Sequence, residues 1–236
     1  MDDRQKSKYV VVALDYSNER DCYSTLEKLN PEHCRVKIGK ELFTACGPSI
    51  VKSAVKLGFD VFLDLKYHDI PNTVESACDA AAELGVWMIN VHASGGRSML
   101  EAAVQRLERR SERPLLVAVT VLTSLDDSAI REIGYGDRTA ALAERLALLS
   151  ADCGLDGVVC STHEISSIKR SCGENFLTVT PGVRPAGTSV DDQKRVATPH
   201  EARAAGGDFL VVGRPITQAE DCAKALRAIY AESAVG

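Results

Sequence analysis

Eight short apolar runs alternate along this chain with segments of helical pattern. The first, residues 9–15 (YVVVALD), is a nearly continuous β-branched run. Such a run is typical of a parallel strand that is buried on both faces of a sheet. The other runs are residues 34–39, 60–66, 86–93, 115–123, 157–161, 176–181 and 208–213. Eight strands that alternate with helices favour a (β/α)8 TIM barrel over an open α/β sheet.

The length of the chain fits one such barrel. Its 236 residues, 45% of them hydrophobic, are enough for one sizeable core, and barrels of this size routinely form a single domain. No Gly-x-Gly-x-x-Gly motif follows the first run, which weakens a dinucleotide-binding sheet. No change in composition marks a second domain. We therefore predict one α/β TIM-barrel domain over residues 1–236.

Charge and hydropathy exclude several classes of partner. The net charge is -5 with no long run of either sign, and only 5% of residues are aromatic. Binding of nucleic acid through a basic face is therefore not expected, although a local basic pocket for a phosphate is compatible with this balance. No apolar run reaches the length of a membrane span, and the polar start MDDRQKSK does not resemble a secretion signal. We expect no membrane partner.

Eight cysteines are scattered along the sequence, and none forms a Cys-x-x-Cys pair. A zinc site or a redox dithiol is therefore poorly supported. Without an export signal, the simplest expectation is free thiols in a reducing, cytoplasmic location.

The densest group of charges lies in residues 62–73, FLDLKYHDIPNT. Because alternate residues of a strand share a face, Asp64 and Lys66 should point the same way. Ile70 and Pro71 should end the extended segment and open a helix, since proline is tolerated in the first helical turn. The charges thus lie where a strand passes into a helix, at the catalytic rim of an α/β protein.

A solvated salt bridge at a strand end is the simplest interpretation of an Asp-x-Lys pair. Here the flanking residues are strongly apolar, which predicts a crowded and partly buried cluster. Two carboxylates about 4 Å apart repel by roughly 4 kcal/mol at an effective dielectric near 20. Lys66, between Asp64 and Asp69 in the sequence, would offset that repulsion and would itself be held protonated.

Polar residues recur wherever a predicted strand stops, which is where a barrel carries its chemistry. They include two acids and two lysines from the first three strands, an alternating set that loop polarity alone does not readily explain. The full set is Asp15, Lys37, Asp64, Lys66, His92, Thr123, Ser161, Arg184, Gly213 and Arg214.

The loops after the last two strands have the features of a phosphate site. Barrels often bind phosphate there through backbone N–H groups and a cation. Arg214 offers a planar fork suited to phosphate oxygens, and Gly213 lets a ligand approach the backbone. A plain turn with a surface arginine is the alternative interpretation, but Arg184 lies in the neighbouring Gly- and Pro-rich loop. That loop is long and polar enough to act as a lid.

With both ends of the barrel considered, the sequence resembles the orotidine 5'-monophosphate decarboxylase family across nearly its whole length. The Asp-x-Lys-x-x-Asp segment is shared with related phosphosugar decarboxylases, but its combination with DIPNT and the two arginine loops is highly specific. The matching segments are VVALDY (11–16), KIGKELF (37–43), FLDLKYHDIPNTV (62–74), GVWMINVHASGG (85–96), AVTVLTS (118–124), GLDGVVCS (154–161), VTPGVRP (179–185) and VVGRPIT (211–217).

The resemblance implies a cofactor-free conversion of orotidine 5'-monophosphate to uridine 5'-monophosphate, in de novo pyrimidine biosynthesis, by a homodimer with shared active sites. By position, Lys37, Asp64, Lys66 and Asp69 would form the charged array, with Asp69 supplied by the second subunit. The implied substrate contacts are Asp15 and Lys37 to the ribose, Asp64 beside the carboxylate, Thr73 across the interface, Thr123 near the pyrimidine with Ser124 less certain, and Arg184, Gln193, Gly213 and Arg214 to the phosphate.

The chemistry agrees with these roles. Loss of carbon dioxide leaves negative charge on a ring carbon, which a metal, a Schiff base or a thiamine ylid would ordinarily stabilise. The sequence contains no motif for any of these. Lys66 could instead stabilise the carbanion and then protonate it, while Asp64 would repel the departing carboxylate. Lys37 and Lys66 have the charge that a metal ion would contribute among the aspartates, so we expect no metal.

Three other residues attract attention but are better explained as structural. His92 ends the fourth strand, and His68 should point away from Lys66 by strand alternation. Cys160 has no identifiable activating base, which favours a buried inert thiol.

Two other functions stay open. One is a magnesium-dependent ketogulonate-phosphate decarboxylase or a phosphosugar epimerase on the same barrel. The other is a non-catalytic barrel that senses a nucleotide, although the intact charged array argues against it.

Overall fold

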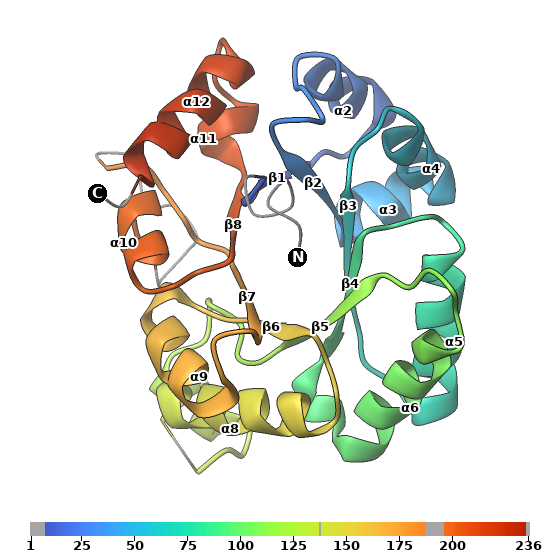
Figure 1. The fold of residues 1–236 in the computed structure, drawn as a ribbon, viewed down its shortest axis with the longest axis vertical. Helices are drawn as coiled ribbons and strands as arrows, with labels where there is room; N and C mark the ends of the chain where they lie inside the picture. The colour runs from blue at the N-terminus through green and yellow to red at the C-terminus, as the bar shows by residue number, and fades with distance from the viewer. Residues whose placement is uncertain (1–7, 137, 187–195, 235–236) are drawn as a thin grey trace.

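The computed structural model describes residues 8–136, 138–186 and 196–234. Its eight parallel strands close into a barrel in sequence order, with the last strand paired to the first, which confirms the predicted (β/α)8 fold. The strands form a central ring and the helices lie around it (Figure 1). The strands are β1 (Val10–Ala13), β2 (Arg35–Gly39), β3 (Val61–Tyr67), β4 (Met88–His92), β5 (Leu115–Val119), β6 (Gly157–Val159), β7 (Leu177–Thr180) and β8 (Phe209–Val212).

The helices follow the strands as the sequence pattern indicates, and several begin at a capping residue. The Asn18 side chain accepts the Asp21 N–H at the start of the first helix, and Thr198 forms a capping box with Glu201. The helices are α2 (Glu19–Leu26), α3 (Lys40–Cys46), α4 (Pro48–Lys56), α5 (Pro71–Ala82), α6 (Arg97–Glu108), α7 (Asp127–Glu132), α8 (Thr139–Asp152), α9 (Ile165–Cys172), α10 (Pro199–Ala204), α11 (Arg214–Thr217) and α12 (Cys222–Glu232), with short 3-10 turns η1 (Ala93–Gly95) and η2 (Thr162–Glu164).

The apolar core has two layers, because alternate residues of each strand face opposite sides. The larger layer lies between the strands and the helices and contains residues such as Val12, Ile38 and Leu63. The smaller layer fills the barrel and includes Phe62, Met88 and Phe209. The barrel interior is therefore packed and leaves its ends to carry function.

Arg35 lies inside the barrel with no solvent exposure. Its guanidinium lies 4.2 Å from the ring centre of Trp87 and 5.1 Å from that of Phe209. Its Nε is 3.3 Å from the carboxylate of Asp60, the residue just before β3. Since Trp87 and Asp60 precede their strands, Arg35 closes the amino-terminal end of the barrel, opposite the end where function is expected.

The fifth strand is shorter than predicted. We expected residues 115–123, but β5 ends at Val119. The Thr120 hydroxyl donates to the Val159 carbonyl oxygen at 3.0 Å, and the chain then turns away from the sheet. Thr123 therefore lies in a loop after the strand.

Among the helices of the described residues, none has the length and apolar character needed to cross a membrane.

Candidate active site

A cavity of about 600 Å³ opens at the carboxyl ends of the strands. Its lining includes eight of the residues predicted from the sequence: Asp15, Lys37, Asp64, Lys66, Thr123, Arg184, Gly213 and Arg214. Ser124 also contributes. The structure thus brings together residues from the first strand to the last around a single hollow.

Four of these side chains form a chain of alternating charge. The Lys37 ammonium lies 2.9 Å from Asp15 Oδ1 and 3.4 Å from Asp64 Oδ2. The Lys66 ammonium lies 2.6 Å from Asp64 Oδ1. Each carboxylate therefore faces at least one ammonium, and this attraction offsets the repulsion between the two carboxylates.

Burial strengthens the effect that these charged side chains have on one another's pKa. The Asp64 side chain is 11% exposed, as is that of Lys37, whereas Asp15 is open to solvent. Burial alone raises the pKa of Asp64, but Lys37 and Lys66 outweigh it and the net shift is downward. Burial alone lowers the pKa of Lys37, but Asp64 and Asp15 outweigh it and the net shift is upward. Both groups are therefore held in their charged forms.

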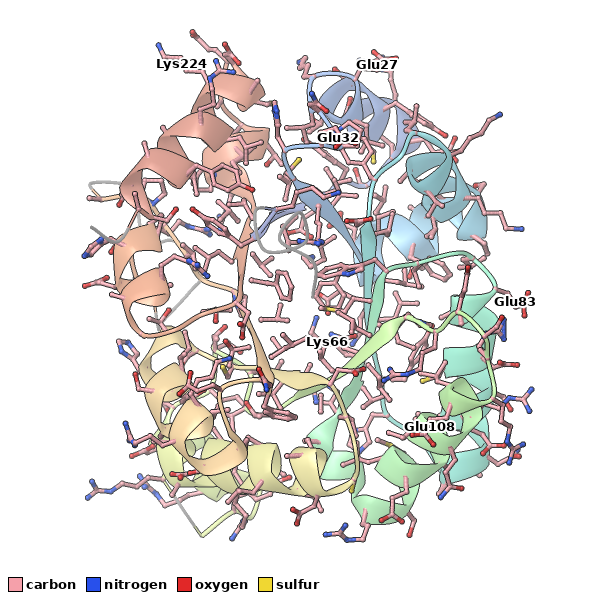
Figure 2. All side chains as sticks on the ribbon, viewed as in Figure 1. Glu27, Glu32, Lys66, Glu83, Glu108 and Lys224 are labelled. Carbon is pink, nitrogen blue, oxygen red and sulfur yellow. The ribbon has the colours of Figure 1, made fainter. Side chains whose placement is uncertain are left out.

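Lys66 has an unusual backbone. Its φ of 54° lies in the left-handed region, and no other non-glycine residue of the described ranges has a positive φ. That conformation costs an L-residue about 1 to 2 kcal/mol. The pairing of β3 with β4 also shifts register between Leu63 and Tyr67. In Figure 2 Lys66 lies within the ring of strands, whereas Glu83 and Lys224 project from the periphery.

Sequence reasoning missed Asn90, which has no solvent exposure in the middle of β4. Its amide nitrogen donates to Asp64 Oδ1 at 2.7 Å, and its amide oxygen accepts the Lys66 N–H at 2.8 Å. The available signal was an amide inside the apolar run MINVH. A buried polar group in such a run needs a partner, and here the partners are the charged residues themselves.

The lining of the cavity also includes the two predicted arginines. Arg184 follows β7 and donates to the Val183 carbonyl oxygen at 3.3 Å, and Arg214 begins α11 directly after β8. Both line the cavity and both are partly exposed. Two guanidinium groups in the lining of one cavity provide a suitable site for an anion with several oxygens. Gln193, the other predicted phosphate contact, lies outside the described residues, as does much of the loop that we expected to be a lid.

Two predicted site residues lie away from the cavity of the described chain. Asp69 is exposed and its carboxylate accepts the Ile70 N–H at 2.7 Å. Thr73 is exposed in the first turn of α5. Neither belongs to the lining of this cavity.

Of the residues that we interpreted as structural, Cys160 lines the cavity, whereas His68 and His92 do not. The His92 and His68 rings lie 5.4 Å apart, centre to centre. Burial, followed by His68 and Lys40, lowers the pKa of His92 to about 4. The alternation that should turn His68 away from Lys66 is interrupted, since Lys66 itself has a left-handed backbone. Burial raises the pKa of Cys160, which agrees with an inert thiol.

Comparison with known proteins places this arrangement in a family. Residues 8–229 match the model of the orotidine 5'-phosphate decarboxylase / HUMPS family. A protein of Teredinibacter turnerae named orotidine 5'-phosphate decarboxylase is 57% identical over 216 residues, which cover 92% of this chain and 93% of that protein. One of the same name from Saccharophagus degradans is 53% identical, over 95% of this chain and 94% of its own length.

Solved structures agree. The crystal structure of orotidine 5'-phosphate decarboxylase from Lactobacillus acidophilus has a TM-score of 0.86 at 39% identity, and the match covers 97% of this chain and all of that one. An uncharacterized conserved protein from Geobacillus kaustophilus has a TM-score of 0.84 at 38% identity, with 95% of this chain and all of that chain covered.

Proposed function

This chain belongs to the orotidine 5'-phosphate decarboxylase / HUMPS family and is a carboxy-lyase of pyrimidine biosynthesis. We propose that it decarboxylates orotidine 5'-monophosphate without a cofactor and that Lys66 is the proton donor. The product would be uridine 5'-monophosphate. The observation that carries the proposal is the Lys66 ammonium, held 2.6 Å from Asp64 Oδ1 at the edge of the cavity.

The reaction breaks the bond between the ring carbon and the carboxylate, and the electron pair stays on the ring. A fixed ammonium beside that carbon stabilises the developing charge without any reorganisation of water. One N–H proton of Lys66 then passes to the ring carbon, and the neutral amine regains a proton from solvent. Asp64 already holds this ammonium in the absence of substrate, which supports the proposal of a donor fixed in advance.

Asp64 has a second role in the proposal. With substrate bound, its carboxylate would lie beside the departing one and repel it. At about 4 Å and an effective dielectric of 20, such repulsion is worth roughly 4 kcal/mol. Enzymes lower barriers by about 8 to 23 kcal/mol, so most of the effect must come from other interactions.

Binding of the remote parts of the substrate is the natural source of the rest. Arg184, Gly213 and Arg214 would hold the phosphate, together with Gln193. Asp15 and Lys37, joined at 2.9 Å, would hold the ribose hydroxyls. Thr123 would lie near the pyrimidine, with Ser124 beside it. These assignments are supported by the cavity, which the described members of the set line together.

The working enzyme in this proposal is a homodimer. Asp69 and Thr73 would enter the partner's active site, and both lie on an exposed segment between β3 and the first turn of α5. Ile70, between them, is 66% exposed, as an interface residue would be in an isolated chain.

A cytoplasmic location is part of the same proposal. All eight cysteines are free thiols and most are buried, which suits a reducing compartment.

The cofactor-free claim is tested by assaying the protein in excess chelator after exhaustive dialysis. We expect the rate of orotidine monophosphate consumption, followed by absorbance, to match that of untreated protein. A rate that is lost in chelator and restored by magnesium would contradict the proposal and favour a metal-dependent decarboxylase.

A further inference from the structure

We propose that Asn90 is a positioning residue for decarboxylation, because its side chain fixes the Asp64 carboxylate and the Lys66 backbone at the same time. The inference rests on the function proposed above and deepens it. Asn90 is not itself in the cavity lining, so it would act through the two residues that it holds.

The location of Asn90 demands such partners. It lies in β4 between Ile89 and Val91, and all three residues have no solvent exposure. An amide buried among apolar side chains is unfavourable unless both of its polar atoms are hydrogen-bonded. Here the amide nitrogen reaches Asp64 Oδ1 at 2.7 Å and the amide oxygen reaches the Lys66 nitrogen at 2.8 Å.

The two partners allow only one orientation of the amide. An ionised carboxylate only accepts hydrogen bonds, so the NH2 group must face Asp64. A backbone N–H only donates, so the amide oxygen must face Lys66. Rotating the amide by half a turn would place like groups together at both contacts, and the side chain therefore has a single hydrogen-bonded state.

This single state is tied to the unusual backbone of Lys66. The register of β3 against β4 shifts between Leu63 and Tyr67, and Lys66 lies in that interval with a φ of 54°. Within the interval, the Lys66 N–H donates to the Asn90 side chain. Asn90 thus supports the bend from which the Lys66 side chain departs.

The Lys66 side chain is consequently held at both ends. The Lys66 backbone N–H donates to Asn90, and the Lys66 Nζ donates to Asp64, which also accepts a hydrogen bond from Asn90. Loss of the amide would release both members of the pair together. A misplacement of about 1 Å at reacting groups can reduce a rate by roughly a hundredfold.

The charged surroundings of Asn90 make a pH-resolved test possible. From β3 the titratable neighbours are Asp64 and Lys66, whereas Tyr67 packs toward the helices; β2 contributes Lys37, and β4 itself contributes His92. β5, which pairs with β4 on the other side, is the apolar run LLVAV and adds no titratable group.

The first variant is Asn90→Leu, which has a similar volume but no polar atom. For folded protein we expect kcat to fall roughly a hundredfold, by the same factor at every pH. The dissociation constant for uridine 5'-monophosphate should change less than threefold, since the groups proposed to bind phosphate and ribose are untouched. A kcat within threefold of the wild-type value in folded Asn90→Leu would overturn the proposal.

The second variant is Asn90→Asp, which keeps the acceptor for the Lys66 N–H but puts a second carboxylate against Asp64. At low pH one proton shared by the two carboxylates restores the donor that the amide supplied, and at higher pH that proton is lost. We expect the ratio of variant to wild-type kcat to rise as the pH is lowered. A ratio independent of pH would contradict the proposal, because a residue that only stabilises the fold would give that result. This near-isosteric variant also keeps the proposal testable if Asn90→Leu does not fold.

Thr178→Val is the matched control. Thr178 is also fully buried in a barrel strand, and its hydroxyl lies 3.1 Å from Asp208 Oδ2, away from the cavity lining. It should lower the unfolding temperature without changing kcat. Wild-type protein that failed to consume orotidine monophosphate would refute the proposed function itself, whereas an active wild type with an equally active Asn90→Leu would refute only the role of Asn90.

Discussion

Asp64 is the side chain on which the charged array converges. It contacts Lys37 at 3.4 Å, Lys66 at 2.6 Å and Asn90 at 2.7 Å while it is only 11% exposed. Removing one partner of a buried ion pair commonly costs about 3 to 5 kcal/mol, because the other charge is left uncompensated. A substitution of Lys37, Asp64 or Lys66 therefore changes the charge balance of the other two, and the kinetics of each such variant should be interpreted together with its stability.

His92 gives a pH dependence of stability whose sign follows from its surroundings. Its pKa in the folded protein is lowered to about 4. Above the ordinary histidine pKa near 6.5 it is neutral in both states and contributes nothing. As the pH falls from about 6.5 to about 4 the unfolded chain takes up a proton that the folded protein refuses, so stability is lost.

We therefore expect His92→Gln to lose less stability than the wild type over this range. The difference should be on the order of 1 to 2 kcal/mol, since the ring is partly exposed. Urea unfolding at pH 7 and pH 4.5 measures it. Equal losses in the two proteins would show that His92 does not contribute.

At the scale of single elements, periodicity predicted the strands well and their local distortions poorly. The alternation in residues 60–66 correctly predicted that Asp64 and Lys66 meet, and they do so at 2.6 Å. It gave no sign of the left-handed Lys66, because that conformation accompanies a register shift against β4 and a hydrogen bond to Asn90. Both depend on pairing with a segment more than 20 residues away, which local pattern does not encode.

The end of β5 could not be predicted for a similar reason. Val121 and Leu122 continue the apolar run past Val119, where the strand stops. At that point Thr120 donates to the Val159 carbonyl oxygen of β6 through both its backbone N–H and its hydroxyl, and the chain then leaves the sheet. In the sequence, an apolar residue at the start of a buried loop looks the same as a further residue of the strand.

Arg35 allows a prediction about the amino-terminal end of the barrel. Its guanidinium stacks against Trp87 and Phe209 and lies beside Asp60, with no exposure to water. Arg35→Met keeps much of the volume but removes the cation–π contacts and the charge pair. We expect it to lower the free energy of unfolding by about 2 to 4 kcal/mol, with little effect on kcat because the cavity is at the other end.

Arg97→Met is the matched control for this measurement. Arg97 forms ion pairs with Glu101 and Asp152, but its side chain is 50% exposed. An exposed pair of this kind contributes at most about 1 kcal/mol. Urea denaturation of both variants compares them directly, and equal effects would show that burial of Arg35 adds nothing.

At the scale of the whole molecule, one cavity brings together two groups of side chains with different proposed roles. The arginines would bind the phosphate, and the lysine and aspartate array would act on the ring. If binding energy from the phosphate is used to reach the transition state, Arg214→Ala should impair turnover as well as affinity. We expect kcat to fall at least about tenfold and KM to rise. A higher KM with unchanged kcat at saturating substrate would mean that the phosphate contributes only to binding.

The sequence could predict which residues form the site, but not which of two subunits supplies each of them. Asp69 follows Lys66 by three positions, yet it is exposed and bonded to the Ile70 N–H. Spacing placed it in the array, but nothing in the residues themselves assigns it to one chain or to two. Its assignment to the partner's site came from the family resemblance and stays a prediction.

Mixing two inactive variants tests the shared site. Lys66→Ala and Asp69→Ala proteins, denatured together and refolded, should form hybrid dimers. One site of each hybrid would hold Lys66 from one chain and Asp69 from the other. Random pairing then restores about a quarter of the wild-type activity, because half the dimers are hybrids with one good site in two. No recovery over the separate variants would mean that Lys66 and Asp69 act within the same chain.

The proposed chemistry depends on the Lys66 ammonium, which would stabilise the carbanion in place of a metal or an organic cofactor. The most direct test is the steady-state decarboxylation of orotidine monophosphate by Lys66→Ala, measured in chelator beside the wild type. We expect wild-type turnover to persist and the variant to lose at least about a thousandfold in kcat, while it still folds and binds uridine 5'-monophosphate. Turnover within tenfold of the wild type in that variant would contradict the account.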